Sequence, residues 1–285
     1  KVRLAQVLSP PFVPGLFIFR PIQNIDKMQH IISYSGGLGS AITAEAICNL
    51  YGSDNVTLLF ADTLVEDTDL YRFSREFVSK LNCHFARISD GRTPWQVFED
   101  VGYIGNTRID PCSQYLKRAL IKRYLKKFYK PDECIVWIGI DCTEEHRLAP
   151  VVKKNLPYTY RSYLIENNIF LTNSYKKDWC ERIGIEAPRL YKFGFAHNNC
   201  GGFCVKAGLG QFKKLYEFLP EVYTQNELEE QRVMQNNPKL KPFLRKSING
   251  KLTYITLKDY RIKYLEPGNI SQDEELQFGG CGCAL

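Results

Sequence analysis

The sequence predicts an α/β fold, a Rossmann-like parallel sheet with flanking helices, followed by a smaller and mostly helical C-terminal region. Three observations carry this prediction. Short buried strands alternate with amphipathic helices, a glycine-rich turn follows the first strand, and the alternation weakens after about residue 150. Strands that alternate with helices pair in parallel through crossover connections, and ligands of such sheets bind at the carboxyl ends of the strands.

The individual elements follow from the spacing of apolar residues. Helix 40–51 places Ala44, Ile47 and Cys48 on one face, and helix 67–82 repeats its apolar residues at the same spacing. Thr93 and Gln96 have the spacing of a capping box, which predicts another helix start. Strands are expected at 30–34, 55–61, 83–89 and 134–140.

The later part of the chain has weaker patterns. The runs "KKDWCERIG" and "AGLGQFKKLYEFL" predict helices, and "QNELEEQRVMQN" predicts a charged, exposed helix. The Asn-Gly pair in "SINGKLTYITL" predicts a small hairpin. We expect residues 1–27, which contain four prolines, to be an extension outside the fold, with domains at 28–210 and 211–285.

Composition restricts the function classes. The chain has 285 residues, 44% hydrophobic and 24% charged, and no apolar run reaches the roughly 18 residues of a membrane span. A cytoplasmic protein without a membrane partner is therefore expected. The net charge of +7 suits anionic ligands such as nucleotides or nucleic acid, although scattered solubility charge explains it equally well.

The turn after the first strand has the composition of a phosphate-binding loop. In "SYSGGLGSA" the glycines let backbone N–H groups approach an anion, the serines add hydroxyl donors, and the next helix adds its positive N-terminal end. No Gly-Lys-Ser/Thr follows, and G-x-G-x-x-G is absent. The predicted pyrophosphate-binding residues are Ser35, Gly36, Gly37, Gly39 and Ser40.

A basic segment, the second candidate for phosphate binding, lies at residues 115–130. It contains seven Lys or Arg and no acid, with an apolar stripe of Leu116, Leu120, Tyr124 and Phe128. Most of these charges suit a solvated face. Lys117 and Arg118 are the better phosphate candidates because they lie in the first turns of the predicted helix.

The ten cysteines are not spaced like a secreted disulfide framework, and Cys48 and Cys134 are expected in the core, with Cys83 and Cys142 as further core candidates. Cys112 follows Asp110 and Pro111, the pattern of a capped helix N-terminus, which favours a thiolate that is a nucleophile or a metal ligand.

Cys200 and Cys204 flank two glycines and supply two further ligands, so a complete metal site needs more. His197 is a zinc-ligand candidate, a plain loop residue or a nucleotide contact.

Five segments in order resemble one family. The Ser-Gly-Gly-x-x-Ser loop resembles the PP-loop of ATP pyrophosphatases and of the phosphoadenosine phosphosulfate (PAPS) reductases. "FADTLVEDTDLY", "DPCSQYLKR", "GIDCTEEHR" and "LYKFGFAHNNCGGFCVKAG" resemble further segments of the reductase branch. Together they cover roughly residues 29–210.

The resemblance implies an adenine nucleotide alpha hydrolase-like fold that binds ATP or PAPS. It places Asp62 and Thr63 near the adenosine and adds Glu145 and Arg147 to the nucleotide site. Many ATP-cleaving members have aspartate where this chain has Gly39, so whether Mg²⁺ accompanies the nucleotide stays open.

The resemblance also implies a cluster and a reactive tail. Iron–sulfur members use cysteines that match Cys112, Cys200 and Cys204, and we hypothesise a [4Fe–4S] cluster completed by Cys283, with zinc as the alternative metal. Cys281 then matches the tail nucleophile of PAPS reductases. The opposite assignment of the two tail cysteines stays open, as does the alternative that both are inert.

Three functions remain. The first is a reductase in which a tail thiolate attacks an adenylyl sulfate and an external thiol such as thioredoxin completes the reduction. The second is an ATP-dependent sulfurtransferase acting on RNA, DNA or a small molecule. The third is a non-catalytic nucleotide-binding accessory protein.

Overall fold

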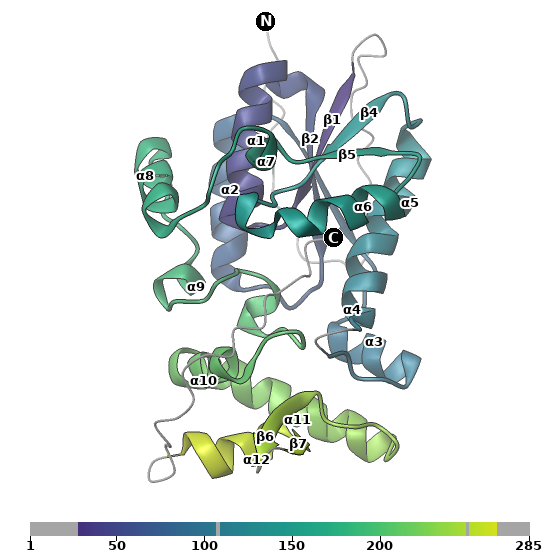
Figure 1. Ribbon diagram of the computed structural model, residues 1–285, viewed down its shortest axis with the longest axis vertical. Helices are drawn as coiled ribbons and strands as arrows, with labels where there is room; N and C mark the ends of the chain where they lie inside the picture. Colours follow the sequence, from purple (N-terminus) through teal and green to yellow (C-terminus); the bar gives the residue numbers. More distant parts are fainter. Residues whose placement is uncertain (1–27, 107–108, 249–250, 267–285) are drawn as a thin grey trace, which may run out of the picture.

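A five-stranded parallel sheet forms the upper part of the molecule (Figure 1). The computed structural model describes residues 28–106, 109–248 and 251–266, so the predicted extension 1–27 lies outside the described residues. The strand order is β3-β2-β1-β4-β5. The strands are β1 (Gln29–Tyr34), β2 (Val56–Asp62), β3 (His84–Ser89), β4 (Cys134–Trp137) and β5 (Thr159–Arg161).

The central strand β1 pairs in parallel with β2 on one side and with β4 on the other. The chain moves outward from β1 to β2 and β3, and then crosses to β4, so its direction of winding reverses between β1 and β4. Open α/β sheets bind ligands beside such a reversal. The α/β prediction is thus confirmed, but β4 ends at Trp137 rather than at residue 140.

Helices cover both faces of the sheet. Side chains alternate along a strand, so Ile32 and Leu58 face α1 (Leu38–Tyr51), α2 (Thr68–Leu81) and α8 (Asn173–Ile183), whereas Ile31 and Leu59 face α5 (Ala119–Phe128) and α6 (Leu148–Lys154). Each face has its own apolar cluster, and Cys48 and Cys134 are buried as predicted.

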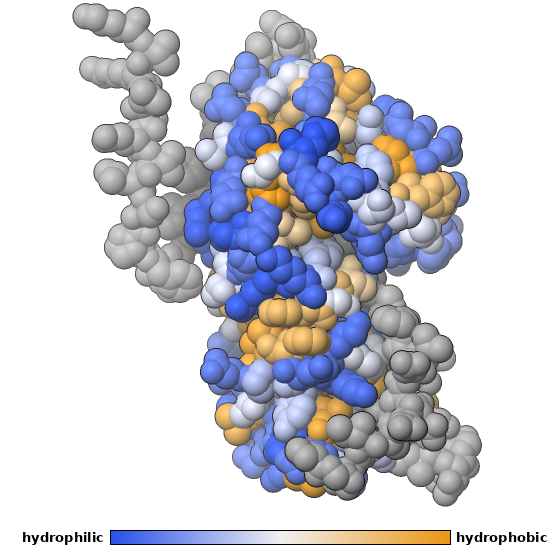
Figure 2. All heavy atoms as spheres, turned by 90° about the vertical axis from the view of Figure 1, so that its left-hand side faces the viewer, coloured by the Kyte–Doolittle hydropathy of each residue, from blue (hydrophilic) through white to orange (hydrophobic). Residues whose placement is uncertain are grey.

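The lower part of the molecule has a third apolar cluster (Figure 1). Trp95 and Phe98 of α3 pack there with Phe212 and Tyr223. The molecule narrows between the upper and lower parts when seen from the α8 side (Figure 2). The elements of the lower part are α3 (Pro94–Val101), α10 (Leu209–Phe218), α11 (Pro220–Asn236), β6 (Leu244–Ile248), β7 (Lys251–Ile255) and α12 (Leu257–Tyr260).

Two local predictions for this part are confirmed. Thr93 caps α3 by accepting a hydrogen bond from the Gln96 backbone, and the Gln96 side chain accepts one from the Thr93 backbone, which completes the capping box. Strands β6 and β7 pair in antiparallel fashion and form the predicted hairpin.

The predicted helix start at Cys112 is confirmed in position, with Asp110 at the cap and Pro111 first, but the side-chain cap bond is absent. Asp110 makes no side-chain cap bond, because its carboxylate accepts hydrogen bonds from Arg118 at 2.9 Å and Lys206 at 3.4 Å. A π-helical turn at Gln114–Arg118 then separates α4 (Pro111–Ser113) from α5. The other short helices are α7 (Tyr163–Glu166) and α9 (Arg189–Lys192), with 3-10 or π turns at Ser53–Asn55, Cys142–Arg147, Cys200–Gly202 and Arg261–Leu265. No helix within the described ranges has the length and apolar character needed to cross a membrane.

Helix α11 is less exposed than its charged sequence predicts. Glu227 and Glu230 are buried against the C-terminal elements. Glu227 accepts two hydrogen bonds from Arg261, at 2.7 and 2.8 Å, which compensates for its burial. Glu230 Oε2 accepts a 2.6 Å hydrogen bond from the Leu257 backbone, whereas Oε1 has no partner within the described ranges. Burial raises the pKa of Glu230 to about 8.

This carboxyl predicts a pH-dependent stability. Because the folded pKa of about 8 exceeds the ordinary value of 4.5, the contribution of Glu230 is complete below pH 4.5 and is lost as the pH rises through 8. We expect Glu230→Gln to flatten the loss of unfolding free energy over this interval, measured by urea denaturation. The exposed control Glu217→Gln should keep the wild-type profile. An unchanged profile in Glu230→Gln would contradict the assignment.

Candidate functional site

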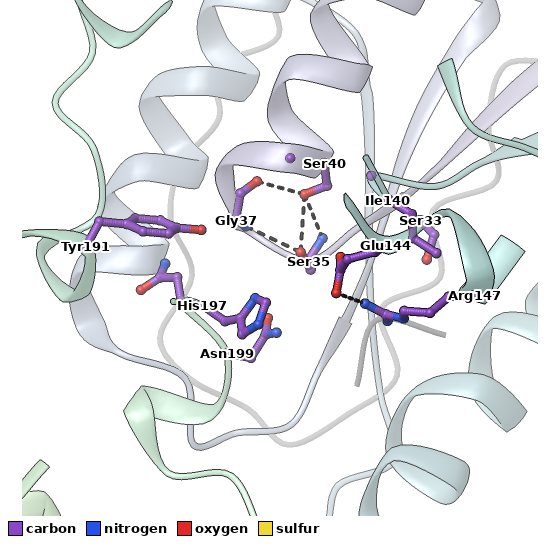
Figure 3. Close-up of a pocket in the computed structure, with 13 residues that line it drawn as sticks. Ser33, Ser35, Gly37, Ser40, Ile140, Glu144, Arg147, Tyr191, His197 and Asn199 are labelled. Carbon is purple, nitrogen blue, oxygen red and sulfur yellow. Dashed lines mark hydrogen bonds and ion pairs between the residues drawn. The ribbon is translucent and has the colours of Figure 1, made fainter. Parts of the chain in front are cut away.

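A pocket opens at the carboxyl ends of β1 and β4, where the winding of the sheet reverses (Figure 3). It includes about 540 Å³ of empty space, counted out to its open mouth. Three segments supply its walls: the β1–α1 loop, the chain after β4, and the chain around and after α9. Its lining residues are Ser33, Ser35, Gly37, Gly39, Ser40, Gly139, Ile140, Glu144, Arg147, Tyr191, His197, Asn198 and Asn199.

The β1–α1 loop folds around its two serines. The Ser40 hydroxyl donates to the Gly37 carbonyl at 2.9 Å and lies 3.2 Å from the Ser35 hydroxyl. The Ser35 backbone N–H donates to Ser40 Oγ at 3.2 Å. Helix α1 has no side-chain cap and no acidic residue in its first turn, so no carboxylate of that turn offsets its positive N-terminal end. The predicted loop residues therefore meet at a helix end that favours an anion.

Two glycines bring separate backbones into contact beside this loop. A Cβ on Gly39 would lie 2.7 Å from the Gly139 carbonyl oxygen, and a Cβ on Gly139 would lie 2.5 Å from the Ser40 nitrogen. Both clashes are with backbone atoms, which cannot rotate away. Many ATP-cleaving PP-loops have aspartate at this place, and its side chain would not fit here without a backbone shift. The presence of glycine at position 39 therefore has a steric explanation.

The segment after β4 brings one ion pair to the pocket. Arg147 pairs with Glu144, and both line the pocket opposite Tyr191 and His197 (Figure 3). Arg147 was a predicted site residue. The predicted Glu145 is not among the lining residues, and its neighbour Glu144 is. Helical spacing could not distinguish them, because Glu144 has non-helical backbone angles inside a 3-10 turn.

Five other predicted residues are not among the lining residues: Gly36, Asp62, Thr63, Lys117 and Arg118. Asp62 is fully buried and accepts hydrogen bonds from Tyr71 and Arg87. Arg118 pairs with Asp110 at 2.9 Å. The nucleotide roles of Asp62 and Arg118 stay predictions, since these contacts occupy them with protein partners.

Thr63 and Lys117 meet at a buried carboxylate. Thr63 donates to Glu66 Oε1 at 2.9 Å, and Lys117 Nζ lies 3.5 Å from the same oxygen. Burial raises the pKa of Glu66, although Lys117 and Thr63 both act in the opposite direction. The Cys200 backbone N–H donates to the other Glu66 oxygen. Glu66 thus connects the loop after β2 to the predicted cysteine segment.

The three described cysteines of the predicted cluster belong to two segments, α4 and the chain after α9. Cys204 belongs to the apolar cluster of the lower part, and Cys112 packs against that cluster. Cys200 has a left-handed backbone with φ of 52°, and the two glycines after it also have positive φ. The glycines therefore permit a turn that other residues would oppose.

The described part of the chain contains no group of three or more His, Cys, Asp or Glu side chains placed to hold a metal ion. The two tail cysteines, Cys281 and Cys283, lie outside the described residues. The described cysteines do not by themselves form a site for a [4Fe–4S] cluster or zinc, so the cluster stays a prediction and no reaction step is derived through it.

The sequence interpretation missed two lining residues that face the loop. The Leu38 backbone N–H donates to the Tyr191 hydroxyl at 3.2 Å, and Asn198 Nδ2 donates to the Gly36 carbonyl at 3.5 Å. Burial raises the pKa of Tyr191 to about 12, so its hydroxyl keeps its proton at neutral pH. The available signal was the polar run "HNN" between an aromatic segment and the cysteine pair.

No protein-family model and no curated protein matches the chain. Solved structures to which it is similar include a PAPS reductase from Candida auris in a phosphate complex (14% identity, 60% of this chain and 80% of that one, TM-score 0.42). Others are a predicted tRNA methyltransferase subunit from Methanocaldococcus jannaschii (13%, 54% and 76%, 0.35) and an NH3-dependent NAD synthetase from Campylobacter jejuni in complex with nitrate (15%, 75% and 87%, 0.39).

These likenesses are partial. The fold class of this chain rests on its own parallel sheet, its β1–α1 loop and the place of its pocket.

The glycine contact gives a matched pair of variants. Gly39→Ala forces a Cβ against the Gly139 carbonyl and should lower the free energy of unfolding by about 1–3 kcal/mol. Gly210→Ala, in α10 with no atom within 4 Å of its added Cβ, should raise it by about 0.5–1 kcal/mol. Urea denaturation measures both changes. Equal stability of the two variants would show that the backbones do not meet as described.

Proposed function

We propose that this protein is an adenine-nucleotide-binding enzyme of sulfur chemistry whose pocket holds the phosphate groups of the nucleotide. The observation that carries the proposal is the pair of serine hydroxyls, Ser35 and Ser40, at an uncapped helix N-terminus beside the winding reversal of the sheet. Hydroxyl and backbone N–H donors at a helix end favour an anion without any metal ligand. The motif resemblance supplies adenine as the base.

The residues of the pocket divide the binding task. The serines and the first turn of α1 donate hydrogen bonds to the phosphate oxygens. Arg147 pairs with Glu144, and its positive charge also attracts the phosphate groups of the ligand. The close packing of Gly39 on Gly139 keeps the β4 side of the pocket against the loop.

The first candidate reaction is reduction of an adenylyl sulfate. The thiolate of Cys281 attacks the sulfur, an S–S bond forms, the S–O bond to the phosphate breaks, and the adenine nucleotide leaves. An external thiol such as thioredoxin then attacks the S-sulfocysteine and releases sulfite, and its second thiol completes the disulfide. This step rests on the motif resemblance of the tail.

A second candidate is ATP-dependent sulfur transfer to a nucleic acid. The observation that favours it is the exposed basic surface of α5, where Lys122, Arg123, Lys126 and Lys127 face solvent. A polyanion would bind such a surface in a salt-dependent manner.

The two reactions release different products. We expect the full chain, purified without oxygen, to release sulfite from PAPS in the presence of thioredoxin. Pyrophosphate released from ATP only when RNA or DNA is present would select sulfur transfer instead. If the chain binds the nucleotide but releases neither sulfite nor pyrophosphate, the result would select an accessory nucleotide-binding protein. Failure to bind ATP or PAPS would contradict the proposal itself.

Ser40→Ala provides the site control, because the Ser40 hydroxyl, which donates to the Gly37 carbonyl, would turn its proton to a phosphate oxygen of the bound nucleotide. Loss of that hydrogen bond should weaken nucleotide binding about tenfold, measured by calorimetry. Ser53→Ala is the matched control, since its hydroxyl donates to Leu81, away from the pocket lining. If both variants bind the nucleotide like the wild type, the serine loop is not the phosphate site.

A further inference from the structure

The chain around and after α9 places two unused hydrogen-bonding atoms in the pocket. Neither Tyr191 nor Asn198 belongs to the glycine-rich loop, yet both contact its backbone. Tyr191 extends toward Gly37 from the side opposite Glu144 and Arg147 (Figure 3). One of the two unused atoms is a donor and the other an acceptor.

The unused donor is the phenolic proton of Tyr191. The hydroxyl oxygen accepts the Leu38 backbone N–H at 3.2 Å, within the first turn of α1. The proton itself has no acceptor in the part of the chain that the structure describes. The Tyr191 hydroxyl therefore lies at the N-terminus of α1, where an anion is favoured. There it can donate its proton to an anionic oxygen.

The unused acceptor is Oδ1 of Asn198. This side chain is 1% exposed, and its Nδ2 donates to the Gly36 carbonyl. Oδ1 has no hydrogen-bond partner within the described ranges. Buried carbonyl oxygens are nearly always paired, so an unpaired one in a residue that lines a pocket is a candidate acceptor for a bound ligand.

Four other polar side chains of the pocket already contact one another. Ser35 and Ser40 lie within hydrogen-bond distance of each other, and Glu144 pairs with Arg147. Asn55 shows that an unpaired oxygen is not sufficient by itself, since its Oδ1 is also buried without a partner in the described part, far along the chain from any lining residue. Asn198 differs because it is one of the residues that line the pocket.

We propose that Tyr191 and Asn198 form a recognition pair for a phosphorylated ligand that also carries a hydrogen-bond donor. Tyr191 donates its proton to an anionic oxygen held at the α1 N-terminus, and Asn198 accepts a hydrogen bond from a hydroxyl or amino group of the same molecule. This deepens the proposed function, because a nucleoside phosphate has both groups whereas inorganic pyrophosphate has only the first.

Tyr191 is tested with pyrophosphate alone. Tyr191→Phe should weaken pyrophosphate binding about tenfold in isothermal titration calorimetry, as expected for a lost hydrogen bond to a charged oxygen. Tyr158→Phe is the matched control, since its hydroxyl donates to the Tyr129 carbonyl at 3.0 Å on the other face of the sheet. The midpoint temperature of thermal unfolding should fall by a similar amount in both variants. Wild-type pyrophosphate affinity in Tyr191→Phe would overturn the donor role.

Asn198 is tested by comparing two ligands. Asn198→Ala should weaken ATP about tenfold and leave pyrophosphate within about twofold, because only ATP carries a donor for Oδ1. Asn55→Ala, which loses a similar buried amide away from the pocket, should leave both affinities unchanged. Equal losses for ATP and pyrophosphate in Asn198→Ala would overturn the acceptor role.

ATP analogues then identify the donor. One of inosine triphosphate and 2′,3′-dideoxy-ATP should bind the wild type more weakly than ATP and lose nothing further in Asn198→Ala, since the contact is already absent. Further loss with both analogues would contradict the pairing. If the wild type binds no nucleotide more tightly than it binds pyrophosphate, the proposed function and the acceptor role of Asn198 both fail. The donor role of Tyr191 is still decided by the pyrophosphate titration of Tyr191→Phe.

Discussion

The pocket depends on one steric constraint, the contact between the backbones of Gly39 and Gly139. Gly39 lies in the first turn of α1 and Gly139 follows β4, and a side chain on either would meet the backbone of the other segment. This contact holds the positive end of α1 against the carboxyl end of β4, at the reversal of the sheet. The serine hydroxyls, the Glu144–Arg147 pair and the open space between them take their positions from it.

A second set of contacts joins the pocket to the cysteine segment. Tyr191 accepts a bond from the first turn of α1, and the Cys200 backbone N–H donates to the buried Glu66. The chain between them therefore contacts the loops after β1 and β2 at the same time.

Local sequence predicted the parts of the fold that local physics determines. The capping box at Thr93 and Gln96, the hairpin and the serine loop all depend on residues within a few positions of one another. The buried carboxylates of α11 were not predicted, because Glu227 is compensated by Arg261, which lies 34 residues further along the chain. Contacts of that range leave no periodic signal.

The candidate site was likewise predictable only where its residues belong to a local sequence motif. Ser35, Ser40 and Arg147 line the pocket as their motifs indicate, whereas Tyr191 and Asn198 reach it through a loop without periodicity. A buried oxygen without a partner is visible only in three dimensions.

Amide chemical shifts of the isotopically labelled full chain, titrated with inorganic pyrophosphate, test the central claim most directly. We expect the largest shifts at residues 35–40, with a second group at residues 191–199, because both segments line the proposed anion site. Shifts confined to the basic surface of α5, or a complete absence of saturable shifts, would contradict it.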